Sequence, residues 1–305
     1  MIKNTLTKGY ALAILSAFTA ANTYFTSKHI LNLVTVFQFG ILWFGFALIY
    51  NSAYIIFTRK FRKLFILPVK AYFILALFAF IEIIATTSFF IAIKLMENPA
   101  IVSFLGNISP ALVTLLAMLL LKERFNLKEG IGVIIAITGV FFVSFRWSFK
   151  LDSLFVAGSE YVLLSAMAVS INIIIAKKFI HQLQPELLSI TRVISLLLFS
   201  LIALLSSTQK FGFQSETVLF AMYGAFIGPF LGACAQYYAL KYIPVSKVVI
   251  IQSSKSFMIL LMAFVLLGLW PLWIQIAGGV LTIAGIIMVT VNSNTQTGKH
   301  LGIAN

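Results

Sequence analysis

Two ionisable residues of this sequence, Glu82 and Lys255, lie inside long apolar runs, where a charge is costly and therefore indicates a function. Thr86 follows Glu82 by one helical turn, so both side chains would share a helix face. A carboxylate there could bind a proton and a solute amine in turn, or it could be a paired structural group. Gln252 lies one turn before Lys255, which could bind a solute carboxylate or form an ion pair with Glu82.

Further polar side chains recur within the apolar runs. Asn107 shares one helix face with Pro110, which indicates either the lining of a polar pathway or hydrogen bonds between helices. Asn22 and Asn172 occupy matching places in two related segments, and Gln236 is a weaker candidate of the same kind.

Few residues could support metal, cofactor or nucleotide chemistry. The single cysteine, Cys234, excludes a disulfide framework and a cysteine-ligated metal site. The histidines lie at the edges of apolar runs or in the tail, and the only aspartate, Asp152, lies in a connector. No Gly-x-x-x-x-Gly-Lys-Ser/Thr loop that would cradle ATP occurs. We therefore expect no metal, no cofactor and no ATP.

The composition indicates an integral membrane protein. Of 305 residues, 61% are hydrophobic and 10% charged, and the mean hydropathy is +1.05. Soluble domains are nearer about half apolar and a quarter charged. The net charge of +14 would favour nucleic acid in a soluble protein, but here the basic residues lie in short connectors between apolar runs. We therefore expect a lipid bilayer around the chain and no nucleic-acid partner.

Ten segments are long and apolar enough to be membrane-spanning helices. They are Gly9–Ser27, Leu33–Phe57, Ala71–Ile93, Pro99–Leu121, Gly130–Phe145, Leu154–Ala176, Leu187–Ser206, Thr217–Leu240, Pro244–Leu267 and Trp273–Val291. These runs are continuously apolar, which favours an all-α membrane protein over a barrel. Most lysines and arginines fall in the connectors on the side of the N-terminus, which predicts a multi-pass protein of the cytoplasmic (inner or plasma) membrane with both termini in the cytoplasm.

Glycine and arginine positions add two expectations about packing. Gly228 and Gly232 belong to a Gly-x-x-x-Gly-x-x-x-Gly pattern that begins at Gly224, with Pro229 inside it. Small residues let helix backbones approach closely, so we expect tight packing, with a hinge at Pro229 as the alternative. Arg192 lies near the start of its segment, and we expect its side chain to extend to the membrane surface.

The chain repeats itself. Phe89–Val102 matches Gln236–Val249, and Leu121–Val143 matches Leu267–Val289, with glycines at corresponding places. We expect two five-helix halves, at 9–145 and 154–292, followed by a polar tail at 293–305. Because each half has an odd number of spans, the halves must insert with opposite orientation, as in secondary transporters that bind solute between inverted repeats.

The halves resemble the EamA-type unit of the drug/metabolite transporter superfamily. The residues that carry the resemblance are Pro110 in the fourth helix, Glu123 after it, and the glycine-rich fifth helix with Gly132 and Gly139. The second half departs from the pattern at Leu269, where the acid would stand. The resemblance implies a ten-helix bundle that exchanges metabolites or drugs across the cytoplasmic membrane, often as an exporter of amino acids or similar compounds.

Three classes of function fit the sequence to different degrees. We expect a secondary transporter of a small amino acid-like or drug-like solute that works by alternating access, with proton-coupled export as one form. A channel or scaffold subunit is the alternative, and a membrane-embedded enzyme fits least because no helix interior holds a histidine or an aspartate pair. With both halves in one chain, a monomer suffices and a dimer is compatible.

Overall fold

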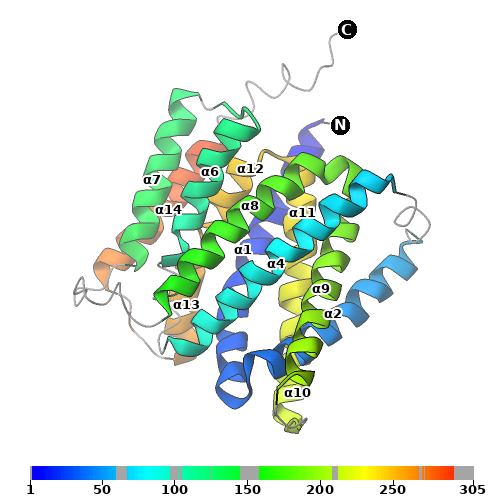
Figure 1. Cartoon of the computed structure of the whole chain (residues 1–305). Coiled ribbons are helices and arrows are strands. Elements are labelled where there is room, and N and C mark those ends of the chain that lie inside the picture. The colour runs from blue at the N-terminus through cyan, green and yellow to red at the C-terminus, as the bar shows by residue number, and fades with distance from the viewer. Residues whose placement is uncertain are drawn as a thin grey trace.

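The computed structural model is a bundle of helices and contains no strand among the residues that it describes, which are 2–59, 67–96, 102, 105–124, 126–144, 158–207, 212–267, 270 and 272–291. Its helices are α1 (Ile2–Leu33), α2 (Val36–Phe57), α4 (Val69–Leu95), α6 (Ile108–Leu120), α7 (Leu127–Ser144), α8 (Ser159–Leu183), α9 (Pro185–Leu205), α10 (Ser215–Ala225), η2 (Phe226–Gly232), α11 (Ala233–Tyr242), α12 (Val245–Gln252), α13 (Lys255–Leu267) and α14 (Trp273–Val291), and all of them except η2 are labelled in Figure 1. The helices α10, η2 and α11 follow one another without a break.

Each of the ten predicted segments contains helix. In the described part of the chain, six helices are long and apolar enough to cross a membrane: Val36–Phe57, Val69–Leu95, Ser159–Leu183, Pro185–Leu205, Ser215–Tyr242 and Val245–Met262. The all-α membrane fold is therefore confirmed, but the number of ten spans is confirmed only in part. Residues 99–101, 103–104, 145 and 154–157 of three predicted segments, and the predicted tail at 293–305, lie outside the described residues.

Two predicted segments, Pro99–Leu121 and Pro244–Leu267, are not the continuous helices that we expected. A turn at Asn107 precedes α6, and Ser253 and Ser254 separate α12 from α13. The hydroxyls of these two serines donate to carbonyls of the preceding turn at 3.0 and 2.7 Å. Short polar side chains compete in this way for backbone groups, and this competition favours a turn within the helix.

The glycines of the repeat join the last helices of the two halves. A β-carbon built on Gly132 would lie 3.0 Å from the carbonyl oxygen of Gly285, and one on Gly139 would lie 2.6 Å from that of Gly278. Only glycine leaves room for so close an approach of α7 and α14, which lie side by side at one edge of the bundle (Figure 1).

A lysine ties the first helix of each half to the end of the third. Lys28 Nζ on α1 donates to carbonyls at the end of α4, including that of Met96 at 2.8 Å. Lys177 Nζ on α8 donates to carbonyls at the end of α11, including that of Ile243 at 2.8 Å. Met96 and Ile243 correspond in the repeat, so these two lysine ties are the same contact made twice. A cation at a helix C-terminus also interacts favourably with the helix dipole.

The two lysine ties lie at opposite ends of the bundle. Lys8, near the start of α1, lies 5.6 Å from the centroid of the Tyr242 ring at the end of α11, so the Lys177 tie is at that end. Lys28 lies about 30 Å further along α1 at a rise of roughly 1.5 Å per residue. Figure 1 agrees, because α1 starts and α8 ends on the side of the bundle that carries the N-terminus. The two halves therefore run in opposite directions.

Carboxylates close the N-terminal end of the bundle. Glu123, which follows α6, accepts hydrogen bonds from the backbone N–H of Val245 at 2.8 Å and from the hydroxyl of Ser246 at 2.6 Å, at the start of α12. The buried Lys247 on α12 forms an ion pair with the buried Glu129 on α7 at 3.0 Å. Both contacts attach the fourth helix of the second half to the first half.

Candidate functional site

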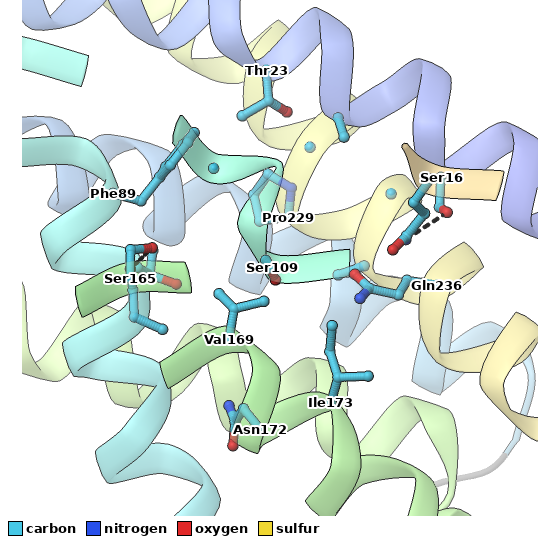
Figure 2. Close-up of a pocket in the computed structure, with 18 of the residues that line it drawn as sticks. Ser16, Thr23, Phe89, Ser109, Ser165, Val169, Asn172, Ile173, Pro229 and Gln236 are labelled. Atoms are coloured by element: carbon cyan, nitrogen blue, oxygen red, sulfur yellow. Dashed lines mark hydrogen bonds between the residues drawn. The ribbon is translucent and has the colours of Figure 1, made fainter. Parts of the chain in front are cut away.

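Helices of both halves surround a cavity of about 240 Å³. Figure 2 shows Ser16 and Thr23 of α1 on one side of it and Val169 and Asn172 of α8 on the other. Ligand sites are concave, mostly apolar and fitted with a few polar groups, and helix bundles form them between their helices. The cavity is therefore the candidate binding site.

Glu82 is the most connected polar residue of the cavity wall. Its side chain is buried, and Oε1 lies 2.7 Å from Arg192 Nε and accepts a hydrogen bond from Thr86 at 2.8 Å. Oε2 accepts a hydrogen bond from the Asn172 amide at 2.6 Å. Since Arg192 and Asn172 belong to the second half, the carboxylate joins the two halves at the cavity.

Arg192 does not extend to the membrane surface as its place in the sequence predicted. Its guanidinium lies beside Glu82, and Nη2 also donates to Thr86 Oγ1 at 3.3 Å. The orientation of Nε does not suit a hydrogen bond, so its contact with Oε1 is ionic. A carboxylate within reach offsets the cost of burying a guanidinium. The sequence left open whether Glu82 forms an ion pair with Lys255. In the structure its partner is Arg192.

Lys255, Gln236 and Gln252, which we predicted to lie on a solute pathway, also line the cavity. Lys255 is the first residue of α13, and its Nζ lies 5.9 Å from the centroid of the Tyr24 ring. The Gln252 amide donates to Ser16 Oγ at 2.9 Å. Tyr24 was not singled out from the sequence, because nothing in its run distinguishes it from neighbouring aromatic residues.

Asn107 holds the two interrupted helices together. Its amide nitrogen donates to Ser256 Oγ at 2.9 Å, and Ser256 Oγ lies 3.1 Å from Asn107 Oδ1. The match of Leu121–Val143 with Leu267–Val289, continued towards the N-terminus, places Asn107 opposite Ser253. The interruptions therefore fall at equivalent points of the two halves. In secondary transporters such broken helices meet at the solute site.

Like Asn107, Asn22 is a predicted pathway residue that is not among the residues lining the cavity. The Asn22 amide donates to the hydroxyl of Tyr223 at 3.1 Å. The resemblance to Asn172 reflects the repeat and is not matched by a shared contact.

The glycine pattern lies in the helix that includes η2. A β-carbon on Gly228 would lie 2.7 Å from Thr23 Oγ1, and one on Gly232 would lie 2.5 Å from Thr19 Oγ1, so both glycines pack tightly on α1. The backbone widens into π-helical turns over Phe226–Gly232, around Pro229, which lacks an N–H for the regular helical bond. Gly228, Pro229, Gly232 and Pro110 all line the cavity.

The histidine, cysteine and acidic side chains of the described part of the chain are dispersed. There, no group of three His, Cys, Asp or Glu side chains could hold a metal ion. The arrangement instead offers one ion pair, a second cation, amide groups and aromatic walls, which suits the binding of a small organic molecule.

Comparison with known proteins gives the same fold and a family. A family model of EamA-like transporters matches residues 7–145 and 157–291. A crystal structure of a protein superposes with a TM-score of 0.73 at 17% sequence identity, over 95% of this chain and 99% of that chain, a likeness that shows the fold alone. No sequence among curated proteins matches this chain. Since the family model covers nearly the whole chain as two repeats, this multi-pass membrane protein belongs to the EamA-like transporter family of the drug/metabolite transporter superfamily.

Proposed function

We propose that this protein is a secondary transporter that moves a small metabolite or drug-like solute by exposing the central cavity alternately to the two sides of the membrane. The observation that carries the proposal is the cavity between two oppositely directed halves, with the Glu82–Arg192 ion pair crossing the junction. Inverted repeats that enclose a site at mid-depth are the architecture on which rocking-type alternating access depends.

The candidate residues divide into two roles in this proposal. Lys255, Gln236 and Gln252 face the solute, because they line the cavity from the second half. Glu82 and Thr86 form a framework with the amide of the facing helix α8.

The ion pair weighs against the proton-carrier role predicted for Glu82. Both of its carboxylate oxygens are already engaged, one by Arg192 and Thr86 and the other by Asn172, so the side chain serves as a contact between the two halves. We therefore propose that Glu82 contributes to transport by holding the two halves in place. If a pH gradient drives transport, the proton is carried by another group.

We also propose the orientation and the functional unit. The end of the bundle with Lys8, Lys177 and Lys247 is the cytoplasmic end, because lysines and arginines concentrate there. On this basis both termini lie in the cytoplasm. A monomer suffices, because a single chain encloses the cavity.

Counterflow in liposomes tests the transporter proposal. Reconstituted wild type should exchange at least one solute of a panel of amino acids, organic acids, amines and nucleobases in a saturable manner. Val169→Trp places an indole at the cavity wall and should abolish exchange. Ile171→Trp, on an exposed position of the same helix, should retain it. Unsaturable ion current in the same vesicles, or equal exchange by both variants, would contradict the proposal.

A further inference from the structure

Lys255 is a cavity residue that has no counter-charge among the residues that the structure describes. It lines the cavity at the start of α13, and its closest recorded interaction is with the face of the Tyr24 ring at 5.9 Å. Among the described residues it takes part in no ion pair and no side-chain hydrogen bond. A cation–π contact offsets only part of the cost of keeping an ammonium group out of water.

The other charges of the cavity neutralise each other. Glu82 and Arg192 are its remaining formally charged residues, and they lie 2.7 Å apart. Both carboxylate oxygens of Glu82 are engaged, one by Arg192 and Thr86 and the other by Asn172. Among the described residues that line it, the cavity therefore carries one net positive charge, at Lys255, and has no unengaged carboxylate to receive an amine.

The Tyr24 ring that lies near Lys255 belongs to an aromatic and apolar part of the cavity lining. The Tyr24 ring that faces the ammonium packs edge-to-face on Phe89, with centroids 5.1 Å apart, and both rings line the cavity. Val102 and Val162 belong to the same wall. A solute that places an anionic group at Lys255 would therefore rest its body on an apolar surface.

We propose that Lys255 binds the carboxylate of the transported solute, and that the cavity selects small monoanionic carboxylates with an apolar body over the corresponding amines and zwitterions. That the bound carboxylate is also transported rests on the proposed function. Its binding at Lys255 can be measured without transport. An ion pair in a site of low polarity also makes Lys255 the main determinant of the sign of the charge that is accepted.

Binding to the purified full-length protein in detergent tests this selection. The probes share one body and differ in one group: 3-phenylpropionate, 3-phenylpropionamide, 3-phenylpropylamine and phenylalanine. Titration calorimetry should give the tightest binding for 3-phenylpropionate and at least tenfold weaker binding for the other three. Equal binding of the acid and the amide, preference for the amine, or no binding of the acid at millimolar concentration would each overturn the proposal.

Three variants assign the effect to Lys255. Lys255→Met removes the charge at similar size and should weaken 3-phenylpropionate at least tenfold while leaving the amide unchanged. Lys255→Arg should retain most of the affinity for the acid, which separates loss of charge from loss of fold. Lys8→Met removes another lysine that lies over a tyrosine ring, outside the cavity, and should bind like wild type. Undiminished binding of the acid by Lys255→Met would overturn the assignment.

Vesicle counterflow separates this proposal from the transporter proposal. If the protein exchanges other solutes but does not discriminate in favour of carboxylates, the carboxylate site at Lys255 is contradicted and the transporter proposal stands. If 3-phenylpropionate binds in a way that depends on Lys255 but no solute is exchanged, the carboxylate site stands and the transporter proposal is contradicted.

Discussion

The second helix of each half lies against the third helix of the other half, and the two contacts differ in chemistry. In one, Arg192 of α9 forms an ion pair with Glu82 of α4. In the other, Trp43 of α2 packs on α10 and η2, where a β-carbon on Gly224 would overlap the indole and one on Gly228 would lie 3.2 Å from it. The repeat thus preserves the backbone arrangement while one contact is ionic and the other apolar.

The third helices differ at the same level. The match of Phe89–Val102 with Gln236–Val249, continued towards the N-terminus, places Pro229 opposite Glu82. The first half has a regular helix with a buried carboxylate there, and the second half has the π-helical turns of η2. Equivalent places in an inverted repeat have therefore acquired a charge in one half and an irregular backbone in the other, and both line the cavity.

The largest expected effect comes from breaking the ionic contact. Arg192→Met leaves the Glu82 carboxylate buried without a cation, and loss of one partner of a buried pair costs about 3–5 kcal/mol. Thermal or chemical unfolding in detergent should show that loss of stability. The double variant with Glu82→Leu removes both charges and should recover most of it, because apolar replacement of a whole buried pair is often neutral or better.

A matched variant on the same helix gives the control for this prediction, and the double-mutant cycle of Arg192 and Glu82 tests their coupling. Ser195→Ala, on the same helix as Arg192, should cost far less, since the Ser195 hydroxyl bonds back to a carbonyl of its own helix and to no other described residue. A loss of under about 1 kcal/mol for Arg192→Met, or additive single effects, would show that the ion pair does not hold the halves together.

The apolar contact should fail by overpacking, with a smaller loss. Gly224→Ala places a methyl group on the Trp43 indole and should cost about 1–3 kcal/mol of unfolding free energy. Gly45→Ala on α2 has open space around it and should be neutral or stabilising, as alanine favours helix over glycine. Trp43→Leu combined with Gly224→Ala should restore part of the loss. Equal unfolding midpoints for the two alanine variants would contradict the close packing.

The sequence predicts the parts of this molecule that depend on composition and on repetition. The contact of the matched glycines between α7 and α14 was not predicted, but the positions of the helices, the repeat and the recurrence of these glycines all follow from apolar runs and from spacing. The ion pair of Glu82 does not, because Arg192 lies in a different half and its run gives no sign of the carboxylate that it meets. The interruptions at Asn107 and Ser253 were also missed, since isolated polar residues in an apolar run predict a turn only when their hydrogen bonds are known.

The lysine ties offer the finest comparison, because here the halves are alike. Lys28→Met and Lys177→Met each remove a charged donor from the C-terminal carbonyls of a helix and should each cost about 1–2 kcal/mol of unfolding free energy. Lys178→Met, the exposed neighbour of Lys177, should leave stability unchanged.

Transport assays then show whether the Lys28 and Lys177 ties have the same role in transport. The ties sit at opposite ends of the bundle, so each holds its own side of the membrane in the present arrangement. If the two halves exchange conformations during transport, the two methionine variants should open the cavity towards opposite sides of the membrane. Cysteine-reactive probes added from either side to a cavity variant such as Val169→Cys would report this access. The same direction for both would show that the ties only stabilise the fold. In that case the functional difference between the halves would rest on the ionic and apolar contacts at the cavity.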